Sequence, residues 1–324
     1  MLRRWLRTLC GVRPAPAPKD LLFVPRERVE HLWQRVHGLP RVDWRLAALW
    51  IARQTDEEDP AKWRRAIMGA CLDELRDSLT TDHRRWRSAH VEGLAPLEGP
   101  VGQAVSTIAE QACTRLRQDL RRIRGDAAIP PVAIVLIQPT DAYVNFVDSY
   151  FPEEGAFAMT GGLYLNDGAG AFPLIAVNAS APHGCAAAVV HELTHHCLHG
   201  CAIPIWAEEG LTQMMEERLH VGSGFELSAE WVERHRTRWS EVGIDAFVDG
   251  SAFLSPERDT QELAYHLAQW VVRGELTRRP DRFFTFLAHC RDQGPDPAFA
   301  SALGGTPTDL INAIVFGTDA APNH

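Results

Sequence analysis

Two histidines and a glutamate near the middle of the chain have the residue types and spacing of a hydrolytic metal site. His191 and His195 are four residues apart in the pentapeptide His-Glu-Leu-Thr-His. In a helix of 3.6 residues per turn, this spacing places both imidazoles on one face, where they can bind a single metal ion. Glu192 lies beside the pair, where its carboxylate can take a proton from water on that ion.

The histidine pair needs a further ligand, because a catalytic zinc ion takes three protein ligands and keeps a fourth position for water. Glu209 is the candidate, with Glu208 as its neighbour and rival, on a second helical pattern that Pro204 opens. A short link makes two helices antiparallel neighbours, which can bring such a glutamate back over the histidines.

The run HELTHHCLHGCAIPIWAEEGLTQMMEE, residues 191–217, resembles the gluzincin metallopeptidases and is most similar to the peptidase MA-like proteins. It has HExxH, a short gap, and then Pro-x-Trp-x-x-Glu-Gly-Leu. The resemblance covers about residues 131–290. It implies a zincin-like peptidase fold, and it implies that Glu209, which directly precedes the glycine, is the third ligand of one zinc ion.

Other histidines fit the site less well. His196 is rotated off the face that the pair shares, and His199 lies one further turn along that face. A metzincin would have glycine and histidine where this chain has Leu198 and Cys201. We therefore retain the gluzincin interpretation.

The elements before the metal helix indicate a small sheet. The pattern over 101–123 predicts a long amphipathic helix, and the apolar, β-branched run over 131–138 predicts a buried strand. A short strand is expected near 88–94. Two further short strands are expected at 161–165 and 174–178, joined by a turn-forming segment.

The strand just before the metal helix is where family members place the sheet edge that borders the substrate cleft. An open edge offers unpaired N–H and C=O groups to an extended peptide. We expect substrate backbone to bind at Gly161 and Gly162 or at Ala176 and Asn178, and the alternative is a hairpin that only completes the sheet.

Residues after the metal helices have weaker signals. Glu216 returns to the face of Glu209 two turns later and could hydrogen-bond a zinc-binding histidine, or simply be solvated. Ser228 is predicted to cap a helix over 228–240, and 243–256 reads as a loop. The segment 261–272 resembles the downstream gluzincin helix, so Tyr265 is expected to stabilise a developing oxyanion, with His266 as a weaker candidate.

Composition limits the partners. The 324 residues carry a net charge of -9, with 23 basic and 17 acidic side chains in 1–126 but 10 and 25 in 127–324. The acidic second part argues against nucleic acid and favours cationic or neutral peptide substrates. No apolar run reaches the roughly 18 residues of a transmembrane helix.

The seven cysteines are odd in number and scattered over apolar patterns, which is typical of reduced, buried thiols and favours the cytoplasm. Residues 1–20 begin with a basic cluster, but Arg7 interrupts the apolar stretch that a secretory signal needs. We interpret them as a disordered leader, and export by an atypical signal is the alternative.

The sequence thus predicts an α+β protein with a zincin-like metallopeptidase domain after a helical N-terminal region. The expected function is zinc-dependent peptide hydrolysis with Glu192 as general base, by an endopeptidase. The alternative is a non-catalytic, zinc-stabilised interaction module of the same fold. The predicted divisions are a leader (1–20), a helical region (21–85), the peptidase domain (86–316) and a tail (317–324).

Overall fold

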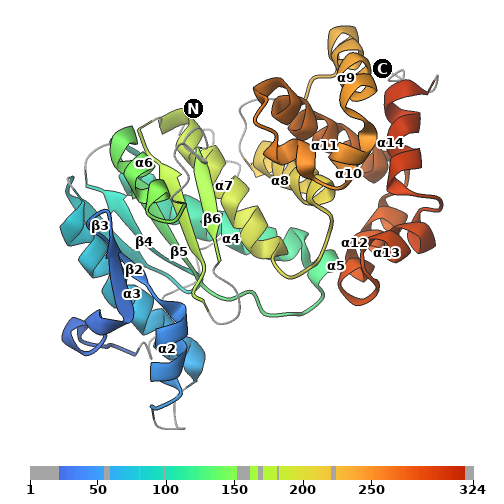
Figure 1. The fold of residues 1–324 in the computed structure, drawn as a ribbon. Coiled ribbons are helices and arrows are strands. Elements are labelled where there is room, and N and C mark those ends of the chain that lie inside the picture. The colour runs from blue at the N-terminus through green and yellow to red at the C-terminus, as the bar shows by residue number, and fades with distance from the viewer. Residues whose placement is uncertain are drawn as a thin grey trace. The chain divides into compact units, whose positions relative to one another are not determined.

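The computed structural model describes residues 22–54, 59–79, 81–97, 100–151, 161–166, 171–180, 182–219 and 224–317, with only the backbone of 100–103 and 182–183. The chain forms two compact units (Figure 1), the first from 1–116 and 128–196 and the second from 117–127 and 197–324. The predicted boundary at 85/86 lies inside a strand of the first unit. The predicted leader and nearly all of the predicted tail lie outside the described residues.

The first unit is built on a five-stranded mixed sheet of order β3-β4-β5-β7-β6. Strands β4, β5 and β7 are parallel, and β3 and β6 pair antiparallel at the two edges. The predicted α+β class with a small mixed sheet is confirmed. The strands are β3 (His83–Arg87), β4 (Val91–Pro96), β5 (Val132–Ile137), β6 (Gly162–Leu165) and β7 (Leu174–Asn178).

Helices cover both faces of this sheet. One face packs against α3 and α6 through an apolar cluster that includes Leu72, Phe146 and Val135. The other face meets α7, where Gly162 of β6 lies against the helix. The helices that begin in this unit are α2 (Trp44–Ile51), α3 (Pro60–Ser78), α4 (Pro100–Asp119), α6 (Thr140–Asp148) and α7 (Pro182–Leu198).

The predicted buried strand and long amphipathic helix are confirmed, with adjusted ends. All six residues of β5 are buried. The helix expected over 101–123 is α4, and a break at Leu120 separates it from α5 (Arg121–Arg124). The strand expected near 88–94 is β4, shifted to 91–96.

The beginning of the described chain is not wholly helical, which corrects the prediction for 21–85. After η1 (Arg26–Arg28) and η2 (Glu30–Leu32), strands β1 (Trp33–Val36) and β2 (Leu39–Val42) form a hairpin. Its turn has φ of +50° at His37 and +80° at Gly38. Positive φ at both central residues is the geometry of a tight hairpin turn, and glycine adopts it without strain.

The second unit is helical in the part of the chain that the structure describes. Helix α8 packs against α11 so closely that a Cβ on Gly210 would lie 2.4 Å from the Ala268 carbonyl oxygen. The loop predicted over 243–256 instead contains α10 and η3. The elements after α5 are α8 (Ile205–Leu219), α9 (Ala229–Val242), α10 (Ile244–Val248), η3 (Ser251–Leu254), α11 (Arg258–Arg278), α12 (Pro280–Gln293), α13 (Pro295–Ala302) and α14 (Pro307–Phe316).

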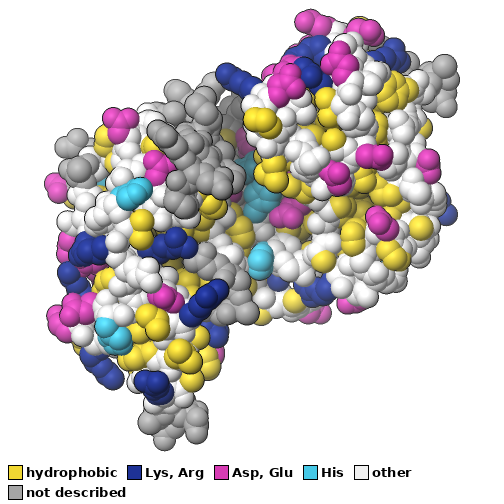
Figure 2. Space-filling view, in the orientation of Figure 1, with side chains coloured by type: hydrophobic (Ala, Val, Ile, Leu, Met, Phe, Trp, Pro, Cys, Tyr) yellow, Lys and Arg dark blue, Asp and Glu magenta, His cyan; other side chains and the backbone are white. Residues whose placement is uncertain are grey.

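The described surface carries charge of both signs, and the cysteines are in the core. Figure 2 shows basic and acidic side chains on the visible face of each unit. The six described cysteines are free and buried, as predicted, and burial raises the pKa of Cys71 and Cys185 to about 12. Among the described residues, no helix is long and apolar enough to cross a membrane.

Candidate metal centre

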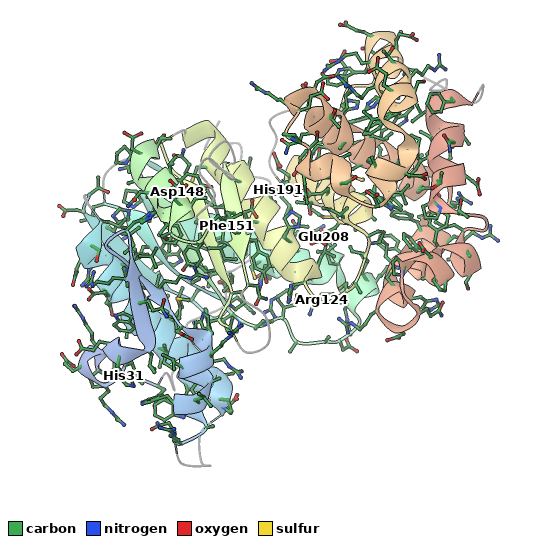
Figure 3. All side chains as sticks on the ribbon, in the orientation of Figure 1. His31, Arg124, Asp148, Phe151, His191 and Glu208 are labelled. Carbon is green, nitrogen blue, oxygen red and sulfur yellow. The ribbon has the colours of Figure 1, made fainter. Side chains whose placement is uncertain are left out.

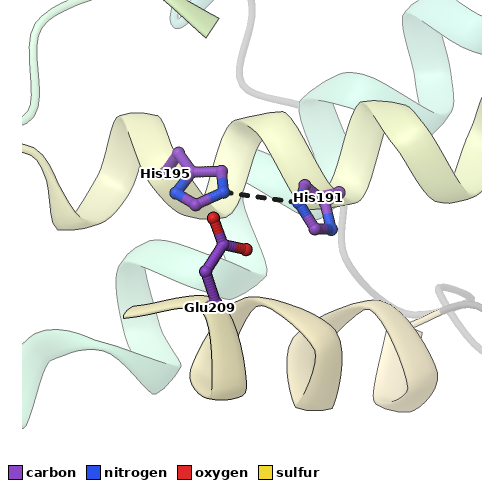
Figure 4. Close-up of side chains that lie close together, drawn as sticks. All are labelled: His191, His195 and Glu209. Carbon is purple, nitrogen blue, oxygen red and sulfur yellow. Dashed lines mark hydrogen bonds between the residues drawn. The ribbon is translucent and has the colours of Figure 1, made fainter. Parts of the chain in front are cut away.

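The two predicted metal-binding histidines lie one above the other on α7. Nε2 of His191 and Nε2 of His195 are 3.3 Å apart, and the rings are inclined at 64°. Two ligand atoms on a tetrahedral zinc ion with bonds of 2.0–2.1 Å are separated by about 3.3–3.4 Å. The pair therefore already has the spacing of two ligands to one ion (Figure 4).

Buried contacts of the neighbouring turn fix the rotation of α7. His196 is 1% exposed, its Nε2 lies 3.0 Å from the Pro130 carbonyl oxygen, and its Nδ1 lies 3.4 Å from the Tyr164 hydroxyl. A histidine with both ring nitrogens bound in this way is structural. The expectation that His196 faces away from the pair is confirmed, and the same contacts direct His191 and His195 to the other side.

The carbonyl groups from Cys197 onward, which belong to the second unit, accept hydrogen bonds from arginines of the same unit. Gly200 has φ of +77°, the left-handed conformation that ends many helices. Arg124 of α5 donates to the carbonyl oxygens of Cys197 and His199, and Arg291 donates to that of Gly200. Cations at the carboxyl end of a helix are favourable because carbonyl groups there lack partners within the helix. Figure 3 labels Arg124.

Among the described residues, Glu209 forms with the histidine pair a group that could hold a metal ion. One ring nitrogen of His191, one of His195 and one carboxylate oxygen of Glu209 all lie within 4.8 Å of one another (Figure 4). Glu209 is buried and belongs to the second unit, in which α8 packs on α11. Its rival Glu208, labelled in Figure 3, is not part of this group.

The predicted general base lies beneath the edge strand of the first unit. Glu192 is 8% exposed, and a Cβ added to Gly162 would lie 2.9 Å from its Cγ and 3.0 Å from its Oε1. The absence of a side chain at Gly162 is therefore what makes room for the Glu192 carboxylate. Since Tyr164 meets His196 one turn further on, β6 and α7 run alongside each other.

Successive residues of β6 point their backbone N–H and C=O groups to opposite sides of the strand. Asn178 N–H donates to the Gly161 carbonyl oxygen, so these residues form a hydrogen-bonded pair of the β6–β7 ladder. The next residue along an antiparallel strand points its N–H and C=O the other way. Gly162 therefore directs its backbone groups to the open edge of the described sheet while it covers Glu192.

This geometry corrects the predicted substrate-binding residues. Ala176 lies on β7, which pairs with β5 and with β6, so the strand before the metal helix is interior and not an edge. The Gly161 carbonyl oxygen is used by β7, and the Asn178 side chain accepts from Ser180 N–H and donates to Thr140. Of the four residues, Gly162 alone keeps backbone groups directed to the edge.

The remaining predicted residues are all placed in the second unit. The ring of Tyr265 packs on Phe253 at a centroid distance of 5.3 Å, and its carbonyl oxygen accepts from Gln213. His266 stacks on Trp231 and lies next to His235, and its own weaker candidacy as an oxyanion donor stays a prediction. Glu216 lines a pocket that is described below. The oxyanion role of Tyr265 remains a prediction.

Sequence reasoning missed the pairing of β6 with α7. Gly162 and Tyr164 are two residues apart and share one face of the strand, and Glu192 and His196 are four residues apart on the helix. Both spacings correspond to about 6 Å along the element. The sequence does not indicate which strand lies beside the helix, so this match could not be recognised from it.

Comparisons with known proteins add no relative. No family model, curated protein or solved structure matches the chain. What the site can do must therefore be argued from its own residues.

Proposed function

We propose that the protein is a zinc-dependent endopeptidase of the gluzincin type, with a zincin-like fold. The observation that carries the proposal is the group of two imidazole nitrogens 3.3 Å apart and a carboxylate oxygen within 4.8 Å of both. Two histidines and one carboxylate form a ligand set used by hydrolytic zinc sites. In this proposal His191, His195 and Glu209 hold one zinc ion.

When bound, zinc would supply a Lewis acid that activates water for attack on a peptide carbonyl. The protein's own residues perform the remaining steps. Glu192, the general base of the proposal, would accept a proton from that water and pass it to the leaving amine nitrogen. Its position against Gly162 supports this role, because the carboxylate is held on the side of α7 that faces the edge strand.

The edge strand offers a means of binding the substrate. An extended peptide could add to β6 as a further strand, with hydrogen bonds to Gly162 and Tyr164, whose backbone groups point away from β7. Such binding recognises backbone rather than side chains, and it suits cleavage within a chain. This supports endopeptidase action on an unfolded or flexible polypeptide.

The test is a metal analysis beside cleavage of a peptide library by the whole chain and by the variant Glu192→Gln. We expect one zinc per chain in both proteins, hydrolysis by the unaltered protein, and a rate at least about 100-fold lower in the variant. Equal hydrolysis by both proteins would refute the assignment of the base. Stoichiometric zinc without any turnover would favour the non-catalytic module instead.

A further inference from the structure

The second unit contains a pocket of about 220 Å³ that the proposed chemistry does not use. Its walls come from α8, from the segment before α9, from the first turn of α9, and from α11, which packs against both α8 and α9. Three kinds of side chain line it: carboxylates, amides and aromatic rings. They are Gln213, Glu216, Glu217, Phe225, Glu226, Trp231, His266 and Gln269, with Gly224.

The pocket lies on the face of α8 that carries Glu209. Gln213 and Glu216 follow Glu209 by four and seven residues, which in a helix returns to nearly the same direction. The rise of 1.5 Å per residue places them about 6 and 10 Å along the axis from Glu209. An extended peptide advances about 3.3 Å per residue. A substrate whose cleaved bond lies at Glu209 would therefore place a side chain two or three residues away from that bond in the pocket.

The aromatic wall is a continuous stack. His266 lies parallel to Trp231 at a centroid distance of 4.0 Å, and Phe225 lies at 4.9 Å from His266 with its ring tilted by 31°. The guanidinium group of Arg234 lies 4.4 Å from the centroid of Trp231, and that of Arg273 lies 5.1 Å from the centroid of Phe225. The rings are therefore fixed by their neighbours.

The central ring of this wall is uncharged. Trp239 donates to Nδ1 of His235, so the proton of His235 is on Nε2 and is donated to Nδ1 of His266 at 2.8 Å. His266 in turn donates from Nε2 to the Glu226 carbonyl oxygen at 3.0 Å. Each imidazole is neutral in this chain of donors. Burial lowers the pKa of His266, which keeps it neutral at physiological pH.

The carboxylates leave the pocket with negative charge. Glu217 is paired with Arg273 and accepts from Gln269. Within residues 182–219 and 224–317, by contrast, no basic side chain forms an ion pair with Glu226. A cation that entered would meet the carboxylates of Glu216 and Glu226, and carboxylates favour an ammonium or guanidinium group.

We propose that this pocket binds the side chain of a lysine or arginine in the peptide substrate. The aliphatic part of such a side chain would pass the parts of the aromatic rings that line the pocket, and its charge would reach Glu226 and Glu216. The inference rests on the proposed peptidase function, because it makes the pocket a specificity site beside the bond that is cleaved. It names basic polypeptides as the substrate class.

The experiment measures peptide affinity and turnover separately. Nonapeptides carry lysine at each of the five central positions in turn, and matched peptides carry norleucine or glutamate there. Norleucine keeps the aliphatic chain of lysine and removes its charge. Affinity is measured by calorimetry with the zinc-loaded variant Glu192→Gln, which binds without turnover, and kcat/KM is measured with the unaltered chain.

We expect one lysine position at which affinity exceeds that of the norleucine peptide by about tenfold. In the Glu192→Gln background, Glu226→Gln should reduce this preference by about threefold, and Glu226→Lys should abolish it. Glu233→Gln removes the same charge from an exposed position of α9 outside the pocket, and should leave the preference unchanged.

Equal affinities for lysine and norleucine at every position would overturn the inference while leaving the peptidase proposal intact. An equal loss of preference in Glu233→Gln and Glu226→Gln would overturn it as well, because the effect would then be one of overall charge. If the lysine preference is found in binding but no peptide is cleaved, the peptidase proposal fails and the basic-residue site remains.

Discussion

Among the described residues, two pairs of histidines have their rings close together, and the geometries of the pairs differ. In the second unit His235 and His266 are 2.8 Å apart, and the indole of Trp239 starts a chain of donors through both rings. In α7, Nε2 of His191 faces Nε2 of His195 at 3.3 Å, with a carboxylate oxygen nearby. The first distance is that of an ordinary hydrogen bond, and the second is that of two ligands on one ion.

The difference shows what distinguishes a structural pair from a candidate metal site. In the structural pair each nitrogen has a defined role as donor or acceptor, so the protein itself satisfies both rings. In the α7 pair, equivalent nitrogens converge on a point that the Glu209 carboxylate also approaches. A cation at that point could bind all three groups together.

The largest expected effect separates the two pairs by metal binding. His191→Ala should lower zinc affinity by more than the roughly 10–100-fold that loss of an outer partner causes. His235→Ala should keep zinc but lose about 1–3 kcal/mol of stability, because Trp239 N–H is left buried without its acceptor. The measurements are metal competition with a chelating dye and chemical denaturation.

Zinc should also raise the melting temperature of the unaltered chain and of His235→Ala, but not that of His191→Ala, because only bound ligand stabilises the folded state. Loss of zinc in His235→Ala with the fold intact by circular dichroism would remove the distinction between the pairs.

How much of this could be predicted depends on the range of the interactions involved. The convergence of His191 and His195 follows from helix periodicity alone, and the approach of Glu209 was predicted from a short link between helices. The strand β5 was predictable because continuous apolar residues imply burial on both faces. The first and the last are local patterns, and the structure agrees with both of them. The role of Glu209 as third ligand stays a prediction.

Long-range pairing accounts for most of what was missed, and the hairpin over 33–42 is the local exception. Strand β3 contains three arginines, so it lacks the alternation of apolar and polar residues that predicts a strand. Two of them, Arg85 and Arg87, instead form ion pairs with the fully buried Glu92 of β4. We expected β7 to lie at the edge of the sheet, but β6 lies there, because β7 also pairs with β5. These two paired segments are about 40 residues apart in the sequence. The hairpin over 33–42 was missed because its aromatic and apolar residues also fit a helical period.

The second prediction concerns the base rather than the ligands. Gly162→Ala should reduce kcat by about tenfold or more while zinc stays bound, because a methyl group at that position must displace Glu192. Steady-state kinetics and metal analysis check it. The matched control is Gly184→Ala on the same helix as Glu192, where an added Cβ meets no atom within 4 Å.

If the role of Gly162 is only structural, Gly162→Ala should lower the stability of the protein and leave the pH dependence of kcat/KM unchanged. Displacement of the base should instead shift the acidic limb of that profile, since this limb reports the ionisation of the group that accepts the proton. An unchanged kcat in Gly162→Ala would show that Glu192 does not depend on this contact.

The smallest effect is expected from the structural pair as the pH changes. Burial lowers the pKa of His235 to about 3 from 6.5, with smaller contributions from His266 and Arg234. Above pH 6.5 the ring is neutral in both states and has no effect on stability. Between pH 6.5 and 3 the unfolded chain binds a proton that the folded chain excludes, so the free energy of unfolding falls by up to about 1.4 kcal/mol per pH unit.

Urea denaturation from pH 7 to pH 4 tests this. His235→Gln keeps a donor towards His266 but cannot take up the proton, so its stability should depend less steeply on pH than that of the unaltered chain. His31, which is exposed and labelled in Figure 3, provides the control, and His31→Gln should leave the slope unchanged. A slope in His235→Gln as steep as in the unaltered chain would show that the acid sensitivity arises elsewhere, and the neutral donor chain would lose its role in the comparison.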